Sequence, residues 1–241
     1  MMPVYQTVVL RMFFGLIFLL PLFGFTEINI GVNNQVNTGT IVGGGCTQGD
    51  GNTASEVRTV KSFDEITVSG VFEVVIGCGK EQNVQVIADR NLLPLISTSV
   101  TGGALVVSSK GAICTQNPMV LEVSLETLTK VVVDGSNEVV LDGGSCTSRL
   151  LSISLDGTST MKLTGSGTAL DIHLSGTAEL DGAGYEAQNV HIRSGDATEA
   201  QVYVIEKLSG VTSGTSEIIF SGSPTVISVE SHDISEIIPA N

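Results

Sequence analysis

The sequence contains no tryptophan, and aromatic residues make up only 5% of it, so a folded core must be built from aliphatic side chains. Basic residues are also scarce: 11 Lys and Arg stand against 25 Asp and Glu, which gives a formal net charge of −14. A nucleic-acid backbone or an anionic membrane surface needs cationic groups for neutralisation. The composition therefore argues against both as partners.

The motifs of several common kinds of site are missing as well. There is no Cys-x-x-Cys and no closely spaced pair of histidines, so the signatures of zinc and redox sites are absent from the sequence. No nucleophile-elbow motif marks one of the many Ser and Thr residues, and no glycine-rich phosphate loop precedes a helical stretch. We therefore expect no catalytic residue, no metal site and no cofactor or cofactor-binding residue.

Long apolar runs are confined to the N-terminus, where residues 12–25 read MFFGLIFLLPLFGF. This run is typical of a signal peptide and is shorter than the roughly 20 residues that span a bilayer. We predict a signal peptide at residues 1–25, with an uncleaved anchor as the alternative, and an exported protein without further membrane insertion. Residues 26–56 are rich in Gly and Asn and are predicted to be a linker, which leaves residues 57–241 for one folded domain.

Glycine is abundant, at 28 residues, and much of it falls in a repeated four-residue pattern. Each copy of this tetrad lies between two runs of alternating apolar residues, and successive copies begin 22, 19, 18 and 20 positions apart. A period of roughly 20 residues with this internal pattern is typical of a β-solenoid that forms one coil per repeat. The copies are Asp134-Gly135-Ser136-Asn137, Asp156-Gly157-Thr158-Ser159, Ser175-Gly176-Thr177-Ala178, Arg193-Ser194-Gly195-Asp196 and Ser213-Gly214-Thr215-Ser216.

Apolar residues lie one and three positions before the tetrads, and another generally lies five positions after the start of each. Stacking of coils about 4.8 Å apart would turn these residues into aliphatic ladders. We predict an all-β domain, a single-stranded right-handed parallel β-helix of about 18–22 residues per coil with an N-terminal strand and loop elaboration. An antiparallel β-sandwich is the alternative, because it also combines short strands with regular turns. The degenerate last coil, at residues 231–234, is expected to be a cap.

The tetrads are expected to be the corners of the solenoid, because Gly tolerates the positive φ of a sharp turn and Ser, Thr, Asp and Asn bond to nearby backbone. The pattern also occurs at Ser69-Gly70, so this segment is predicted to stack on the coil of Asp134, with residues 77–130 as an elaboration. The predicted corner residues are Gly70, Gly135, Gly157, Gly176, Ser194 and Gly214.

The four cysteines are even in number, which predicts two disulfides in an exported protein. Alignment of the Ser69 and Asp134 corners places the second and fourth cysteines at the same edge of adjacent coils. Four cysteines allow three pairings in total, and the sequence alone leaves the others open. The predicted pairs are Cys78–Cys146 and Cys46–Cys114.

Four segments in a fixed order carry a family resemblance: Arg58–Val60, Phe63–Val75, Asn91–Ile96 and Gly103–Val107, followed by the tetrads. This ordered set resembles the auto-transporter adhesin head GIN domain family, also classed as a domain of unknown function, over residues 57–238. The resemblance implies a right-handed single-stranded β-helix on an exported protein and supplies no catalytic residues. None of the tetrads has the family's usual Ser-Gly-Ser-Gly form, so no ligand that depends on an unbroken Ser-Gly ladder is implied.

Two pairs of polar residues are candidates for weaker sites. His173 and His191 lie one coil apart between apolar neighbours, and a surface pair of histidines could bind a metal weakly. Asp134 and Asp156 open consecutive tetrads, where stacked carboxylates could bind calcium. Solvated surface residues are the favoured interpretation of both pairs. Three glutamates just past the tetrads are likewise expected to be exposed: Glu138, Glu179 and Glu217.

These observations predict an exported, non-enzymatic surface or extracellular binding module. It would be an adhesin that presents a β-helix face to polar ligands such as glycans or other cell-surface components. The alternatives are an enzyme that acts on polysaccharides, which β-helices often are, and a purely structural envelope protein. The enzyme is disfavoured because Arg149, Lys162 and Arg193 are isolated in the sequence and form no convergent acid and base set.

Overall fold

The computed structural model describes residues 45–143 and 149–240, which belong to one compact unit, Val42–Asn241. Within these ranges the chain forms strands and one short 3-10 helix, η1 (Leu93–Leu95), and no α-helix. The predicted all-β class is therefore confirmed. No helix of this described part is long and apolar enough to cross a membrane. The predicted signal peptide or anchor and Cys146 lie outside the described residues.

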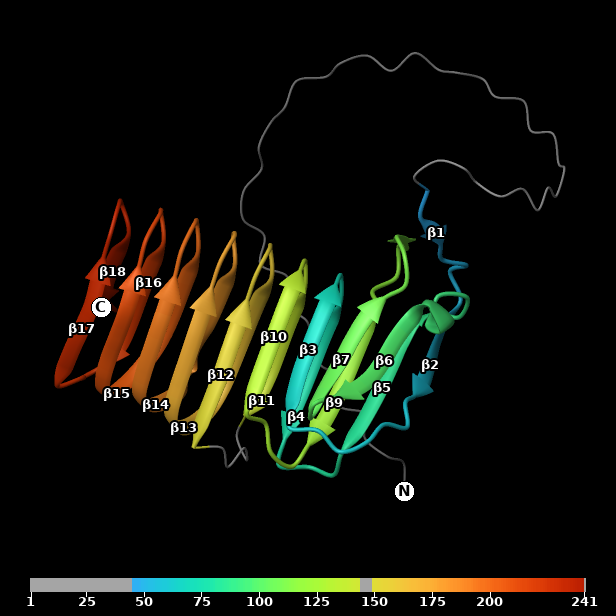
Figure 1. Cartoon of the computed structure of the whole chain (residues 1–241), viewed down its shortest axis with the longest axis horizontal. Helices are drawn as coiled ribbons and strands as arrows, with labels where there is room; N and C mark the ends of the chain where they lie inside the picture. The colour runs from blue at the N-terminus through green and yellow to red at the C-terminus, as the bar shows by residue number, and fades with distance from the viewer. Residues whose placement is uncertain (1–44, 144–148, 241) are drawn as a thin grey trace, which may run out of the picture. The chain divides into compact units, whose positions relative to one another are not determined.

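The strands form a solenoid in which the chain runs along one layer, turns at a corner and returns along a second layer (Figure 1). We call the strands that enter the corners layer 1 and those that leave them layer 2. The three longest strands pass from layer 2 of one coil into layer 1 of the next; they are β13 (Thr160–Leu174), β14 (Glu179–Ser194) and β15 (Glu199–Thr212). The other strands of layer 1 are β3 (Glu65–Gly70), β7 (Ala104–Ser109), β10 (Lys130–Gly135), β12 (Leu150–Leu155) and β17 (Val226–Ser231). Those of layer 2 are β4 (Glu73–Cys78), β9 (Val120–Leu125), β11 (Glu138–Gly143), β16 (Glu217–Gly222) and β18 (Glu236–Pro239).

Adjacent strands within each layer are parallel and in register, so that the inward side chains form the predicted aliphatic ladders. These side chains are buried between the layers and constitute one continuous core. Layer 1 contributes the ladder Ile66, Val131, Ile153, Ile172 and Ile192. Layer 2 contributes the ladder Val74, Val139, Met161, Leu180, Ala200 and Ile218.

The order of the coils in space differs from their order in the sequence. The coil of β3 and β4 lies in the interior of the stack, with β10 and β11 on one side and β7 and β9 on the other. Residues 104–125 therefore form a coil of the solenoid, whereas the sequence predicted an elaboration there. The reason is that their alternating apolar residues extend both ladders. These residues are Leu105, Val107, Leu121 and Val123.

Antiparallel strands close the end of the solenoid next to β7 and β9. β6 (Ile96–Thr101) pairs with β7, and β5 (Asn83–Asp89) pairs with β9. Leu92 and Ile96, which flank η1, are buried against the core. The segment predicted to be a linker contributes β2 (Thr53–Val57), which adds to β5, and the short β1 (Thr47–Gln48).

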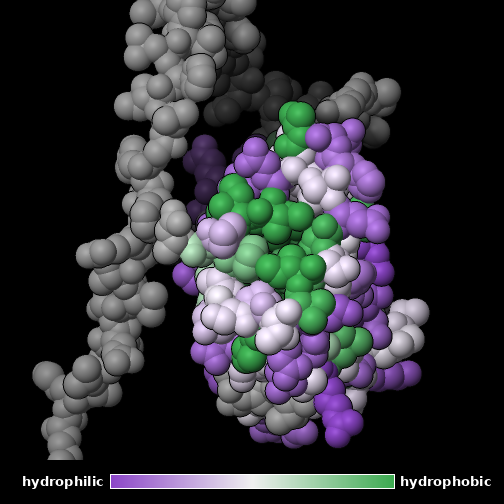
Figure 2. Space-filling model, turned by 90° about the vertical axis from the view of Figure 1, so that its left-hand side faces the viewer, coloured by the Kyte–Doolittle hydropathy of each residue, from purple (hydrophilic) through white to green (hydrophobic). Residues whose placement is uncertain are grey.

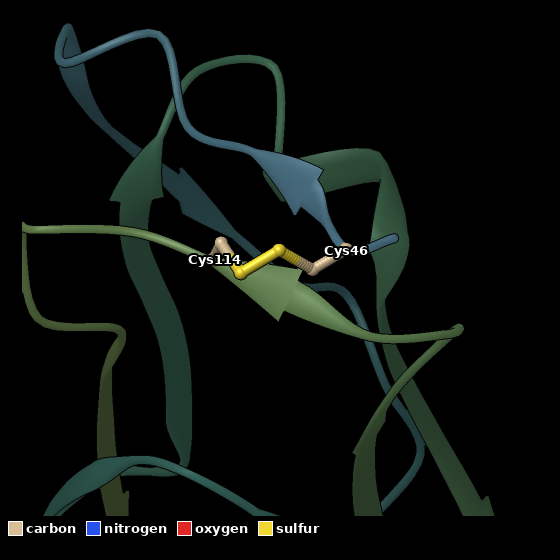
Figure 3. Close-up of a disulfide and its surroundings, with 2 residues drawn as sticks. All are labelled: Cys46 and Cys114. Carbon is tan, nitrogen blue, oxygen red and sulfur yellow. A yellow bond between two sulfur atoms is a disulfide. The ribbon is translucent and has the colours of Figure 1, made fainter. Parts of the chain in front are cut away.

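A disulfide holds β1 to the solenoid. Cys46 is bonded to Cys114 of β8 (Ile113–Cys114), the strand that pairs with β1 (Figure 3). Their Cα atoms are 5.5 Å apart, and this predicted pair is confirmed. The second pair, Cys78–Cys146, stays a prediction, since Cys146 is not described. This pair is supported by the register of β4 and β11, in which Gly77 lies opposite Asp142, so that Cys78 is near the segment that leads to Cys146. Non-reducing peptide mapping would test the pairing.

The corners repeat one backbone arrangement. Gly70, Gly135, Gly157, Gly176 and Gly214 all have positive φ. From one coil to the next, the N–H that follows the corner residue donates to the carbonyl of the preceding corner residue, as in Thr158 N to Gly135 O at 2.8 Å and Thr215 N to Asp196 O at 2.6 Å. A Cβ atom on Gly157 would overlap the Gly135 carbonyl oxygen. Glycine is therefore needed here both for its φ and for the close approach of the two coils.

One corner lies two residues later than the sequence predicted. Leu174 pairs with Ser194, so Ser194 belongs to β14; it is buried and its hydroxyl bonds to Thr212 Oγ1 at 2.8 Å. The corner residue of this coil is Asp196, with a φ of 62°. Aspartate tolerates this left-handed conformation, and Asp196 Oδ2 also accepts a hydrogen bond from Gly176 N at 3.0 Å. The sequence pattern placed this corner at Ser194, two residues too early, because the residue with positive φ is an aspartate and not a glycine.

Candidate binding surface

The outward side chains of layer 1 form two adjacent rows, which are polar except for Val132 and Val211. They alternate with the buried ladder residues, and register places successive members of a row about 4.8 Å apart. We call the ten residues of these rows the layer-1 face. The first row is Lys130, Ser152, Asp171, His191 and Ser209. The second row is Val132, Ser154, His173, Arg193 and Val211.

The centre of the layer-1 face joins a cation, a carboxylate, an imidazole and a hydroxyl. Arg193 Nη1 lies 3.5 Å from Asp171 Oδ1, with the Arg193 side chain exposed and the Asp171 side chain partly exposed. Asp171 pairs in register with His191, whose Nδ1 lies 3.3 Å from Ser209 Oγ. An exposed ion pair of this kind contributes little to stability, so these groups can exchange their partners for those of a ligand.

The two outward histidines do not stack on each other. The register joins residues twenty positions apart, such as Ile172 and Ile192, whereas the histidines are eighteen apart. His173 therefore lies opposite Arg193, and His191 lies opposite Asp171, which does not form the two-histidine ladder considered from the sequence. Across residues 45–143 and 149–240, no group of three or more His, Cys, Asp or Glu side chains is placed to hold a metal ion.

The Asp156 side chain forms hydrogen bonds that stabilise the corner of its own coil. Its Oδ1 accepts hydrogen bonds from Ser175 Oγ and from the Gly157 N–H, both at 2.8 Å. The Ser175 hydroxyl above all, then the Gly157 N–H and the charge of nearby His173, hold the pKa of the Asp156 carboxyl below its ordinary value. The carboxylate is thus ionised and bonded forward to the next coil, and its role here is structural.

The outward side of layer 2 has a different chemical character, because one of its rows consists almost wholly of glutamates. Neighbouring carboxylates of one charge at strand spacing repel each other, and Thr160 interrupts the row. In the adjacent row, Lys162 Nζ lies 3.5 Å from Asp181 Oδ2. Layer 2 is therefore acidic, whereas layer 1 mixes both signs. The glutamates of the row are Glu73, Glu138, Glu179, Glu199, Glu217 and Glu236.

A separate polar hollow of ≈ 430 Å³ lies next to the Cys46–Cys114 disulfide. Its central group is Asp89, which is only 2% exposed. Asn117 Nδ2 donates to Asp89 Oδ1 at 2.6 Å, and Thr115 Oγ1 donates to Oδ2 at 2.9 Å. These bonds, with one from the Gly51 backbone, lower the pKa of the Asp89 carboxyl against the opposing effect of burial. Both oxygens of the Asp89 carboxylate accept hydrogen bonds from the loops around it. We therefore interpret the hollow as a hydrogen-bonded clasp, in which Asp89 joins the loop of Gly51 to the loop of Thr115 and Asn117.

We expect Asp89→Asn to destabilise this clasp at neutral pH. A carboxyl whose pKa is lowered by folding contributes stability that is present above its unfolded value of about 4 and is lost as the pH falls through the folded value. The thermal midpoints of parent and variant should therefore differ at pH 7 and converge in acid, as followed by circular dichroism. Asp181→Asn, which removes an exposed charge from layer 2, is the control. A difference that persists unchanged at low pH would contradict the assignment.

Sequence reasoning missed two features of these surfaces. The contact between Arg193 and Asp171 was hidden because Arg193 was assigned to a corner, whereas it lies within β14. Of the glutamate row, only Glu138, Glu179 and Glu217 were recognised. Glu199 could have been recognised as a member of this row if the fourth corner had been placed two residues later. With that placement, Glu199 aligns with Glu179 and Glu217.

Comparison with protein families matches the chain to the family described as "Putative auto-transporter adhesin, head GIN domain" over residues 62–224. A search of curated proteins gives no match. The match spans the solenoid from before β3 to the end of β16, and thus includes the whole layer-1 face.

Solved bacterial structures share the fold at low sequence identity. A "putative adhesin" from Bacteroides fragilis superposes with a TM-score of 0.66 at 19% identity, covering 80% of this chain and 100% of that one. A "putative lipid binding protein" from Parabacteroides distasonis gives a TM-score of 0.53 at 17% identity, with 82% and 100% covered. A "putative adhesin" from the same species gives 0.52 at 16% identity, with 81% and 100% covered.

Proposed function

Because the chain belongs to the auto-transporter adhesin head GIN domain family, we propose that it is a non-enzymatic binding module at the cell surface or outside the cell. Its layer-1 face would hold a polar ligand of the glycan class. The observation that carries this proposal is the cluster of Asp171, His191, Arg193 and Ser209 on adjacent parallel strands of layer 1.

The chemistry of the cluster suits a polyhydroxyl ligand. A carboxylate accepts hydrogen bonds from hydroxyl groups, a guanidinium donates to them, and imidazole and serine can do either. In-register stacking fixes these groups on strands, which hold side chains more rigidly than loops do. Layer 2 also carries one cation–carboxylate pair, Lys162 with Asp181, but the row beside this pair presents carboxylates almost exclusively.

A non-enzymatic role is supported by the state of the acidic groups. Hydrolysis of a glycosidic bond commonly requires a general acid of raised pKa beside a second carboxylate. The carboxyl of Asp156, at the corner that follows β12, instead has a lowered pKa and is bonded within that corner. Lys162, which the sequence offered as a cation for an enzyme, lies on layer 2 in contact with Asp181.

The experiment is a glycan array and a cell-binding assay with the full chain, followed by Arg193→Gln. We expect this variant to bind about 10–100-fold more weakly, the cost of losing a hydrogen bond that involves a charged group. Lys162→Gln is the matched control, because its ion pair has the same 3.5 Å separation but lies on layer 2. Release of sugar product would instead favour the polysaccharide-acting enzyme, and absence of binding to all glycans and cells would favour a structural envelope protein.

A further inference from the structure

The last coil of the solenoid exposes an apolar surface that crosses both layers (Figure 2). We call this surface of β17, β18 and the corner between them the end face. Ile227 and Ile237 continue the ladders of Leu208 and Ile218. Leu208 is 0% exposed, whereas Ile227 is 51% exposed, because no further coil covers it among the described residues. The predicted cap is therefore not formed by this coil, whose other exposed apolar residues are Val226 and Ile234.

The end face also carries two free strand edges. In the part of the chain that the structure describes, β17 pairs only with β15, and β18 pairs only with β16. A strand with one free edge presents backbone N–H and C=O groups that can pair with another strand. The end face thus combines an open core with an unpaired edge in each layer, a combination typical of an interaction surface.

The opposite end of the solenoid demonstrates how this chain covers such a surface. There, β6 covers β7 in layer 1 and β5 covers β9 in layer 2, and both pairs are antiparallel. Buried Leu92 and Ile96 fill the space over the core. A suitable occupant of the end face therefore supplies one antiparallel strand to each layer and apolar side chains between them.

We propose that a second copy of this chain covers the end face, forming a two-fold dimer that is joined end to end. A two-fold axis in the plane of the end face reverses strand direction, so that β17 and β18 each pair antiparallel with their own counterparts. The same operation places an equal apolar surface opposite Ile227 and Ile237. At the other end β6 and β2 also have a free edge among the described strands, but the core there is already covered, so head-to-tail growth would bury no second apolar surface and closure at two copies is favoured.

The charges beside the end face are compatible with this occupant. Glu230, Asp233 and Glu236 border it, with His232 at 3.9 Å from Glu230. Antiparallel pairing places Glu236, the first residue of β18, toward the end of the counterpart strand, so the carboxylates do not stack as they do along layer 2. The same acidic border disfavours an anionic lipid surface. The dimer goes beyond the proposed binding function, because it would present two layer-1 faces to one ligand-bearing surface and raise avidity.

The test is the mass of the full chain by sedimentation velocity as its concentration is raised, combined with amide hydrogen exchange. We expect a monomer–dimer equilibrium in which amides of β17 and β18 exchange more slowly in the dimer. Ile227→Lys should weaken dimerisation by about 100-fold or more, because it would bury an ammonium group among apolar side chains. Leu150→Lys is the matched control, since Leu150 is also 51% exposed but lies on the side of the solenoid.

A second variant separates dimerisation from folding of the last coil. Ile234, at the final corner, is 73% exposed, so Ile234→Lys should weaken the dimer while the melting of the dilute monomer stays unchanged. The proposal is overturned if the parent stays monomeric, or if both end-face variants dimerise as the parent does. Co-sedimentation of the monomer with phosphatidylcholine vesicles that is lost in both variants would also overturn it, and would assign the end face to a lipid surface.

Discussion

Gly157→Ala is expected to lower the free energy of unfolding by about 3 kcal/mol. Part of this loss, about 1 kcal/mol, comes from placing a side chain at the φ of +79° that Gly157 adopts. The larger part arises because the new methyl group overlaps the Gly135 carbonyl oxygen, and separating the two coils would strain the ladders on both sides of the corner. Urea denaturation followed by far-ultraviolet circular dichroism measures the effect.

Gly51→Ala is the matched control for this prediction. Gly51 has a φ of +74°, close to that of Gly157, but no atom lies within 4 Å of the position its Cβ would occupy. It should therefore lose only the conformational part, about 1 kcal/mol. Equal losses in the two variants would mean that close approach of the coils contributes nothing, and would contradict the packing described for the corners.

Removal of the Cys46–Cys114 disulfide is expected to cost about 4 kcal/mol. The bond closes a loop of 68 residues, and a crosslink of this span restricts the unfolded chain strongly. Because the loop contains β3 and β4, whose coil lies in the interior of the stack, the loss should be seen in global unfolding as well as in the exchange of β1 and β8. The double variant Cys46→Ser/Cys114→Ser, unfolded in urea without reductant, provides the measurement.

Addition of a reductant gives the accompanying control. It should destabilise the parent chain, and any further loss in the double variant would come from the predicted Cys78–Cys146 pair. If the double variant unfolds at the same urea concentration as the parent and only the amides of β1 and β8 exchange faster, the disulfide is a local clip and the prediction of a global effect is wrong.

The sequence predicted the solenoid because its two determinants are local. The ladder residues alternate with a period of two, and the glycines mark where the chain must turn, so that even the pairing of Ser69 with Asp134 could be inferred. The fourth corner could not be placed correctly, because its turning residue is Asp196 and the nearby Gly195 lies one position earlier. That shift of two residues also concealed the positions of Ser194 and Arg193.

Features that depend on the order in which the coils stack could not be predicted from the sequence. Nothing local to Leu105 or Leu121 indicates on which side of the first coil residues 104–125 will pack. The layer-1 face has the same limitation, since Asp171 and Arg193 meet only because their strands are adjacent at a particular register. The open end face was missed because an apolar ladder looks the same in sequence whether or not another strand covers it.

The interior position of the coil of β3 and β4 has a consequence for how the molecule folds during synthesis. A solenoid whose coils follow sequence order can grow from its N-terminus as the chain emerges. Here the first coil needs neighbours from residues 104–125 and 130–143, so it can be completed only after much of the chain has emerged. The interior coil thus makes assembly start late and from the middle, and the later coils from β12 to β18 can then add one after another outward from that nucleus.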